Sequence, residues 1–320
     1  MNRLLMFPLL LSLLVAGALV SLALGAVPLS PAEVWQGLWG GADHFTIQEY
    51  RLPRLLLALL VGSMSAVAGV MVQGVIRNPL ASPDVLGISH GAGLAAVVLL
   101  TLLPGLSLWL LPWIALAGGL LAALLLWLVC AHRTAPVKLA LCGVALSALY
   151  ASITDFLLLT RPVEINAALL WLTGSLWGRG WPQLFGLLPW LSLLPLVLWL
   201  CQRLNLAGLG EEQATTLGER VGRVRLLALL VAVCWSAATV AICGPIAFIG
   251  LVSPHLARAL VGGCHQRLLP MAMLVGALLL LLADLAGRIL APPLELPAGI
   301  MTALLGAPYF LYLLFKMRAA

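Results

Sequence analysis

Residues that carry out catalysis or bind nucleotides are few in this chain and stand far apart. The two lysines, Lys138 and Lys316, do not follow a glycine, so the chain lacks the Gly-Lys-Ser/Thr loop that cradles nucleotide phosphates. The five histidines are isolated, without an H-E-x-x-H pair or a carboxylate four residues further on. We therefore expect a protein that is not itself an enzyme and that binds no metal and no other cofactor.

The six cysteines do not change this view, because none belongs to a C-x-x-C pair and all lie in apolar runs or near their ends. Free cysteines in such runs behave as small hydrophobic residues. Neither a disulfide framework nor a metal cluster is expected. The cysteines are Cys130, Cys142, Cys201, Cys234, Cys243 and Cys264.

Two carboxylates, Asp155 and Asp284, fall inside long apolar runs, near the ends that we expect outside the membrane. Arg288 lies four residues after Asp284 on the same helical face, so the spacing predicts an ion pair. Ion-coupled transporters usually carry ionisable residues deeper in their spans. An ion-coupled secondary transporter that depends on Asp155 or Asp284 is therefore a distant alternative, as is a structural membrane subunit without transport activity.

Arginines on the outer side form a second group: Arg51 and Arg54 precede one apolar run, and Arg288 ends another. One interpretation is that their side chains extend to the membrane interface. The other is that they bind an acidic soluble partner, because a guanidinium group pairs with carboxylates through two hydrogen bonds. Arg161 and Arg179 are weaker candidates for the same surface.

The loop 203–225 is the most polar part of the chain. Within it, glycines stand at both ends of the stretch from Gly208 to Gly218, which is long enough for a short helix. Glu211 and Glu212 favour the N-terminal end of that helix, and Gly218 can end it. Such a helix either packs against its neighbours or couples the chain to a separate ATPase.

A stiff turn over 77–84, with two prolines, is either a hinge of a gate or a tight connection between two spans.

These residues lie in a chain of 320 residues that is 63% hydrophobic and 9% charged, with a mean hydropathy of +1.12. Soluble domains carry about 25% charged residues, so a soluble globular protein is excluded. The formal charge of +6 comes from basic residues scattered between apolar runs, which excludes a nucleic-acid-binding face. The composition predicts an all-α polytopic transmembrane protein, with a single transmembrane domain over 1–320.

Charge-poor apolar runs of roughly 20 residues predict about ten spanning helices. The run from Leu226 to Ala257 has no charge and is too long for one span, and Gly244-Pro245 provides a natural break. Small residues in two runs, from Gly62 to Gly69 and from Gly143 to Ala148, permit close helix packing. The predicted spans are 4–25, 55–76, 85–103, 108–131, 139–160, 183–202, 226–243, 244–262, 268–287 and 297–315.

Basic residues predict the orientation of these spans. With both termini in the cytoplasm, twelve of the seventeen lysines and arginines fall on the inner side, among them Arg3 and Arg133. This distribution agrees with the positive-inside rule. The polar loop 203–225 is then cytoplasmic, and Arg51, Arg54, Arg161, Arg179 and Arg288 are outside.

Eight segments of the chain together resemble the FecCD family of bacterial ABC importer permeases, which take up iron–siderophore complexes, haem and cobalamin. They follow the order of the family and cover nearly the whole chain. The segments are Arg51–Arg54, Gln73–Pro83, Leu86–Ala92, Leu141–Leu146, Trp171–Leu176, Gly244–His255, Ala283–Arg288 and Glu295–Pro308. Three further stretches are most similar to the ferric citrate branch of the family: Gly174–Arg179, Ala214–Gly218 and Pro292–Pro297.

The resemblance implies a BtuC-like permease fold and a function in importing ferric citrate across the bacterial inner membrane by ATP-driven alternating access. Another iron–siderophore complex, haem or cobalamin is the alternative cargo within the family. The implied partners are membrane lipid, a second permease chain of the FecC type, two cytoplasmic ATPase subunits that hold the ATP and magnesium, and a periplasmic substrate-binding protein.

The resemblance also implies roles for individual residues. Arg51, Arg54 and Arg288 match arginines that dock the binding protein, and Asn78 and Leu80 match residues that narrow the inner end of the pathway. A further set falls in the loop that contacts the ATPase: Gly210, Glu211, Glu212, Ala214, Thr215, Leu217 and Gly218.

Overall fold

Helices make up most of the described chain, and no strand occurs in that part of it. The structure, a computed structural model, describes residues 5–25, 27–103, 105–130, 136–161, 165–292 and 294–318. Leu4 and Ala131, which end two of the predicted spans, lie outside these ranges, as do Arg3 and Arg133. The α-helices are α1 (Met6–Ala23), α2 (Pro31–Leu38), α3 (Leu52–Ile76), α4 (Ile88–Leu102), α5 (Leu111–Val129), α6 (Pro136–Thr160), α7 (Ile165–Leu172), α8 (Trp181–Leu187), α9 (Leu194–Gly208), α10 (Glu211–Thr216), α11 (Val221–Cys243), α12 (Ile249–Val261), α13 (His265–Ile289) and α14 (Ala298–Arg318).

Short helical segments of other types join or extend these helices. The π-helix η2 leads directly into α3, and the 3-10 helix η5 makes α8, η5 and α9 one continuous helical stretch. The 3-10 helix η3 precedes α4, and η4 precedes α5. Their bounds are η2 (Thr46–Arg51), η3 (Pro83–Leu86), η4 (Leu108–Leu110) and η5 (Leu188–Leu193).

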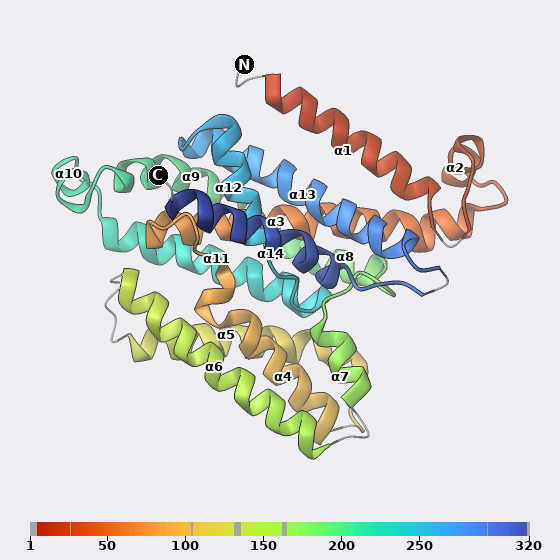
Figure 1. Ribbon diagram of the computed structural model, residues 1–320, viewed down its shortest axis with the longest axis horizontal. Coiled ribbons are helices and arrows are strands. Elements are labelled where there is room, and N and C mark those ends of the chain that lie inside the picture. Colours follow the sequence, from red (N-terminus) through yellow and green to blue (C-terminus); the bar gives the residue numbers. More distant parts are fainter. Residues whose placement is uncertain are drawn as a thin grey trace.

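Three helices, α3, α11 and α13, form the centre of the molecule (Figure 1). In their most apolar stretches 72%, 67% and 67% of the residues are buried, compared with 17% in α1 and 22% in α5 and α6. The buried faces of the three helices consist mainly of alanine, valine, leucine and glycine. A helix that is apolar on all sides fits either a core or a membrane, so hydropathy alone does not separate these central helices from the peripheral ones.

Glycines let the central helices touch backbone to backbone. A Cβ atom added to Gly62 of α3 would overlap the backbone of Gly276 in α13. In the same way, a Cβ added to Gly69 of α3 would overlap the carbonyl group of Gly250 in α12. Close packing of this kind stabilises helix pairs in lipid, where the hydrophobic effect between helices is weak.

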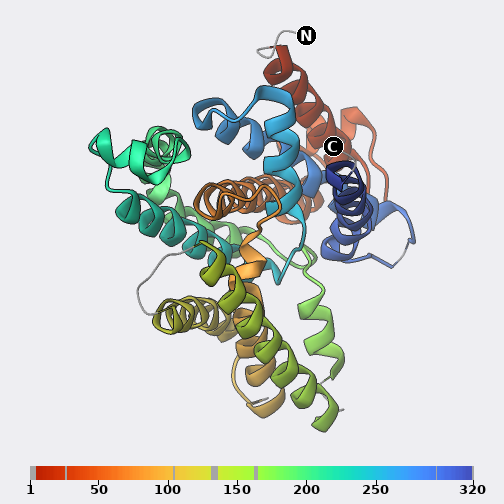
Figure 2. The ribbon, with the colours of Figure 1, turned by 60° about the vertical axis from the view of Figure 1, so that its left-hand side comes forward.

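A second group of helices, α4 to α7, packs along one side of the centre (Figure 2). Small residues again bring two of them together, because Gly91 of α4 lies against Gly118 and Ala122 of α5. Gly143 of α6 lies against the carbonyl oxygen of Val85 in η3, so α6 covers the start of α4.

Each of the ten predicted spans overlaps a helix of the structure. Among the described residues, eight helical stretches are long and apolar enough to cross a membrane. The other two spans match α4 and α12, which have 15 and 13 residues. At about 1.5 Å per residue these two helices reach only about 20–22 Å, less than the roughly 30 Å of a hydrocarbon core.

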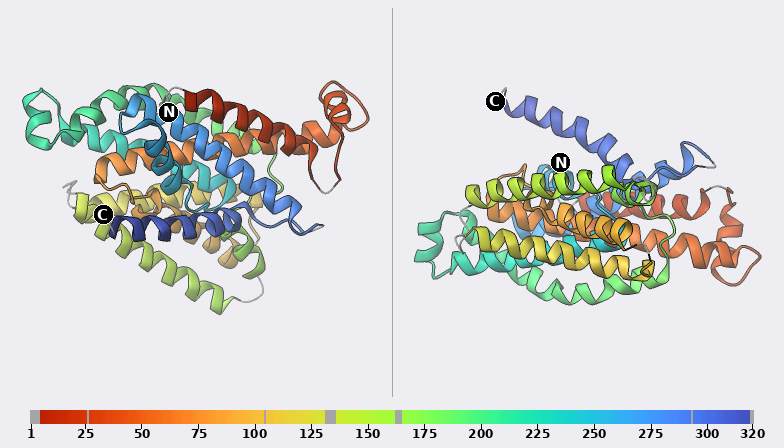
Figure 3. Two further views of the ribbon diagram at one scale, coloured as in Figure 1. Left: turned by 45° about the horizontal axis from the view of Figure 1, so that its top comes forward. Right: turned by 90° about the horizontal axis from the view of Figure 1, so that it is seen from below.

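The short helices α2 and α10 lie at opposite ends of the molecule. The helix α2 begins with a capping box, in which Ser30 and Glu33 exchange hydrogen bonds. It lies at the opposite end of the molecule from α10 (Figure 1). The start of α1 and the end of α14 lie in the half that contains α10, and α14 diverges from the other helices (Figure 3). That α10 faces the cytoplasm and α2 the outside remains a prediction of the charge distribution.

The contact between Gly69 and Gly250 predicts a loss of stability on substitution. Gly69→Ala forces the backbones of α3 and α12 apart, and overpacking of this kind costs about 1–3 kcal/mol. We expect a lower melting temperature of the purified protein. Gly222→Ala is the control, because nothing lies within 4 Å of a Cβ added at that position of α11. Equal melting temperatures for the two variants would contradict the packing argument.

Candidate functional site

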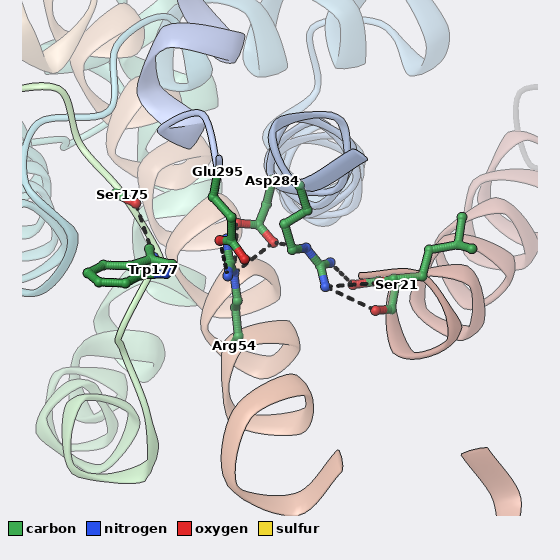
Figure 4. Close-up of polar contacts among 8 residues, drawn as sticks. Ser21, Arg54, Ser175, Trp177, Asp284 and Glu295 are labelled. Carbon is green, nitrogen blue, oxygen red and sulfur yellow. Dashed lines mark hydrogen bonds and ion pairs between the residues drawn. The ribbon is translucent and has the colours of Figure 1, made fainter. Parts of the chain in front are cut away.

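The charged residues at the outer end of the helices form a connected network, which we call the outer charge network: Arg54, Asp284, Arg288 and Glu295. Arg54, in the first turn of α3, donates through Nε and Nη2 to Asp284 Oδ1 of α13 at 3.0 and 2.9 Å. Its Nη1 pairs with Glu295 Oε2 at 2.7 Å. Figure 4 shows the Arg54 side chain between these two carboxylates. One guanidinium group therefore joins α3, α13 and the segment that leads into α14.

Asp284 forms ion pairs with two arginines, Arg54 and Arg288. Its Oδ2 atom lies 3.2 Å from Nε of Arg288, one helical turn further along α13. This pair, which the spacing of the sequence predicts, is confirmed. Because Asp284 is only 2% exposed, its charge depends on both guanidinium groups for compensation.

Two arginines also bind the C-terminal end of α1. Arg51 Nη1 donates to the carbonyl oxygens of Leu22 and Ala23 at 2.6 and 2.9 Å. Arg288 Nη1 donates to the carbonyl oxygen of Ser21 at 3.2 Å, and its Nη2 donates to the Ser21 hydroxyl group. The last carbonyl groups of a helix lack partners within the helix and carry a partial negative charge. The two guanidinium groups satisfy both needs and hold α1 to the outer end of the molecule.

These contacts bear on the expectation that Arg51, Arg54 and Arg288 dock a soluble partner. Arg51 and Arg288 are buried, and the side chain of Arg54 is 12% exposed. All three donate hydrogen bonds to other groups of the chain. The structure therefore gives them a definite role in joining α1, α3 and α13, and the docking role stays a prediction.

An outer cavity of about 520 Å³ lies beside the network. It is bounded by the connection from α1 to α2, by η2 and α3, by the stretch before α8 and by the outer end of α13. Seven charged side chains line it: Asp43, Glu49, Arg51, Arg54, Arg179, Arg288 and Glu295. Tyr50 and Trp177 add aromatic surface.

A larger central cavity of about 840 Å³ lies between α4, α6 and α14. Most of its lining is apolar, from α6, α14 and the irregular stretch before α12. Its charged or polar side chains include Asp84 of η3, Ser89 and His90 at the start of α4, and Thr154 and Asp155 on α6. The Ser89 hydroxyl group donates to Asp84 Oδ1 at 2.7 Å. Sequence analysis did not single out Ser89 or His90, because neither belongs to a recognisable motif of binding residues.

Irregular backbone borders the central cavity where α11 ends and α12 has not begun. The amide of Ser175 donates to the carbonyl oxygen of Cys243 at 2.7 Å, and the amide of Gly299 donates to that of Gly174 at 2.9 Å. Gly244 has a φ of +74°, and a Cβ there would overlap the carbonyl oxygen of Trp171. Non-helical backbone is tolerated at membrane depth where protein groups satisfy it or where it lines a cavity. Interrupted helices of this kind often mark the binding region of a transporter.

At the opposite end, the helix predicted between Gly208 and Gly218 is confirmed as α10. Gly210 and Gly218, which flank it, have φ values of +122° and +82°, a region that glycine adopts without strain. Ala214 is fully buried, whereas Leu217 is 61% exposed. A salt bridge of 3.0 Å from Arg225 to Glu211 fixes the start of α10 against α11. The α10 segment thus exposes the apolar side chain of Leu217 together with several polar side chains, and it is held in place by its contacts with α11.

The turn between α3 and α4 holds the predicted gate residues. The side chain of Asn78 accepts a hydrogen bond of 2.9 Å from the amide of Leu80, which tightens the turn. The neighbouring Arg77 has a φ of +55° and donates to the carbonyl oxygen of Ala207 in α9. The turn is therefore anchored to the helix that leads into α10, and a gating role for Asn78 and Leu80 stays a prediction.

In the part of the chain that the structure describes, no group of three or more histidine, cysteine, aspartate or glutamate residues is placed to hold a metal ion.

Sequence analysis also missed Glu295 as a partner of Arg54. The two residues are 241 positions apart, so no local spacing connects them.

Comparison with known proteins gives matches over nearly the whole chain. The model of the FecCD transport family matches residues 13–316. The Fe(3+) dicitrate transport system permease protein FecD of Escherichia coli (strain K12) is 53% identical over 311 residues, which cover 96% of this chain and 98% of that protein. The Fe(3+)-citrate import system permease protein YfmE of Bacillus subtilis (strain 168) is 47% identical over 312 residues, with coverages of 96% and 93%.

A solved structure also matches this chain. It is an inward-facing conformation of a metal-chelate type ABC transporter, with a TM-score of 0.84 and 35% sequence identity. The match covers 96% of this chain and 97% of the other.

The outer charge network predicts that Asp284→Asn is strongly destabilising. The substitution keeps the volume of the side chain but leaves Arg54 and Arg288 without the charge that both contact. Breaking a buried pair in this way costs about 3–5 kcal/mol. Thermal unfolding of the purified protein measures the loss.

Asp155→Asn is the matched control, because Asp155 is an exposed carboxylate in an apolar helix without a salt bridge in the described chain. We expect it to change stability by no more than about 0.5 kcal/mol. A similar loss in both variants would mean that the network does not stabilise the fold.

Proposed function

The chain belongs to the FecCD transport family and is a multi-pass permease of an ABC importer in the bacterial inner membrane, and we propose that its cargo is ferric citrate. The observation that carries the proposal is the high identity, over nearly the full length, to two permeases named for ferric citrate import. ABC importers act with an ATPase and a substrate-binding protein, and ATP hydrolysis takes place in the ATPase subunit rather than in the permease.

The central cavity supports a role as one wall of the transport path. It is bounded by α6 and α14, and both helices carry large apolar side chains that this chain leaves exposed. Examples are Phe156 and Leu159 on α6 and Leu304 and Leu305 on α14. We propose that a second permease chain of the FecC type packs on this side, so that the path runs between two permeases.

The inner end is suited to an ATPase. Leu217 offers an apolar contact, Glu211 and Glu212 surround it with charge, and the buried Ala214 fixes α10 to the body of the protein. A push on α10 reaches α9 and α11 directly, because Ala214 packs with Ala207 and Val221. The proposed assembly has two ATPase subunits, one for each permease, and movement at the turn of Asn78 and Leu80 opens the inner end.

The outer end is suited to a periplasmic binding protein. The paired side chains of Arg54 and Glu295 are 12% and 25% exposed, and Arg51 and Arg288 hold the surrounding helices in place. In the proposed cycle, acidic residues of the binding protein meet this surface and ATP binding inside closes the ATPases. The path then alternates between the two sides.

Uptake of radioactive iron tests the cargo. Cells that lack this gene should lose uptake of iron supplied as ferric citrate, and a plasmid copy should restore it. Uptake of iron supplied as a catecholate complex or as haem should not change. Unchanged uptake of iron from ferric citrate would mean that the cargo is another chelate or cobalamin. Transport by this chain without any ATPase would favour an ion-coupled transporter instead.

The proposed contact of α10 predicts the effect of Leu217→Glu. A charge in the centre of an apolar contact should weaken association of the ATPase by about tenfold or more, as central interface residues do. Affinity of the purified ATPase for the permease in nanodiscs measures this. Gln213→Asn, an exposed polar change on the same helix, should leave the affinity unchanged. Full affinity of Leu217→Glu would show that α10 is not the contact.

A further inference from the structure

The arginines that line the outer cavity differ in whether their charge is satisfied. Arg54 and Arg288 share Asp284, and Arg54 also binds Glu295. Arg51 donates to backbone carbonyl groups at the end of α1. These three guanidinium groups are occupied by the protein itself.

Arg179 is the exception. Within the described ranges its side chain forms neither a hydrogen bond nor a salt bridge, and its Nε atom is buried without a partner. The acidic side chains of the lining, Asp43, Glu49 and Glu295, form no salt bridge with it. Leaving a buried donor of a charged group unsatisfied is unfavourable. An acceptor that enters the cavity would relieve this cost.

The backbone around Arg179 is built to hold it in place. Gly174 and Gly178, which precede it, have positive φ values of +68° and +69°. The amide of Ser175 is bound to the end of α11, and the carbonyl group of Gly174 accepts from the start of α14. In Figure 4 this stretch, with Ser175 and Trp177, passes close to the outer charge network. Arg179 is therefore a side chain on a fixed segment, which favours binding with little loss of entropy.

The same segment separates the two cavities. Leu172 and Thr173 line the central cavity, whereas Trp177 and Arg179 line the outer one. In the central cavity the charged side chains are the carboxylates Asp84 and Asp155. An anionic cargo therefore finds an unpaired guanidinium group before the central cavity and none of the arginines within it.

We infer that Arg179 binds a carboxylate group of an anionic, citrate-type iron chelate in the outer cavity, before the chelate enters the central cavity. The inference rests on the proposed function and adds a cargo-binding residue to it. A guanidinium group suits this ligand because it binds a carboxylate through two parallel hydrogen bonds. The volume of the cavity, about 520 Å³, lies within the usual range of about 300–1,000 Å³ for small-molecule sites.

The test uses the complete transporter in liposomes, with its second permease chain, its ATPase and its binding protein. Two quantities are measured: transfer of radioactive iron from the ferric citrate-loaded binding protein into the lumen, and the affinity of the unloaded binding protein for the transporter. The variants are Arg179→Gln and Arg179→Lys. Arg161→Gln is the matched control, because Arg161 is an exposed arginine, predicted on the same outer side, that lines neither cavity.

We expect Arg179→Gln to slow the transfer of iron by about tenfold or more, the effect of losing one charge-assisted contact. Arg179→Lys should keep part of the rate, because it keeps the charge but not the paired geometry. The affinity of the unloaded binding protein should stay within about twofold, which also shows that the variants are folded.

Three results would overturn the inference. A loss of affinity for the unloaded binding protein would mean that Arg179 receives an acidic side chain of that protein rather than the cargo. Equal rates for Arg179→Gln and the original protein, or an equal loss in Arg161→Gln, would mean that no specific site exists. Failure of the proposed function gives a different result, since the unmodified transporter would then transfer no iron from ferric citrate.

Discussion

One buried carboxylate holds the outer end of this permease together. Asp284 lies between Arg54 of α3 and Arg288 of α13, and each arginine extends the network further. Arg54 reaches Glu295 before α14, and Arg288 reaches Ser21 at the end of α1. Charges away from water are stable only when they are paired and fully hydrogen-bonded. The positions of four chain segments are therefore set by a single shared charge.

Inside the molecule, glycines hold the chain segments together by allowing close backbone contacts. Lipid offers no partners for backbone groups, so a chain that leaves the helical path must find partners within the protein. Here the end of α11, the start of α14 and the stretch near Gly174 supply them, at distances that only glycine permits. The resulting irregular backbone lines the central cavity beside α6 and α14. Polar backbone groups can therefore line a transport path within the membrane, because neighbouring segments lie close enough to form hydrogen bonds with them.

The two ends of the molecule suit two different kinds of partner. At one end, α10 presents Leu217 on a helix anchored through the buried Ala214. At the other, guanidinium groups surround a cavity, and all but that of Arg179 are occupied by internal partners. This arrangement fits a subunit that receives energy on one side and cargo on the other. It also explains why the chain needs no nucleotide site of its own.

The sequence by itself determines the features that depend on near neighbours. Apolar runs give the helices, Gly244-Pro245 gives the break between α11 and α12, flanking glycines give α10, and the four-residue spacing gives the pair Asp284–Arg288. Only the tertiary structure decides that Arg54 meets Asp284, 230 residues away, and that α3, α11 and α13 are central. The reason is physical. Helix formation in lipid is local. The central and peripheral spanning helices are similarly apolar, with mean hydropathies of 1.7 to 2.4, so the partners of each helix follow from side-chain packing in three dimensions.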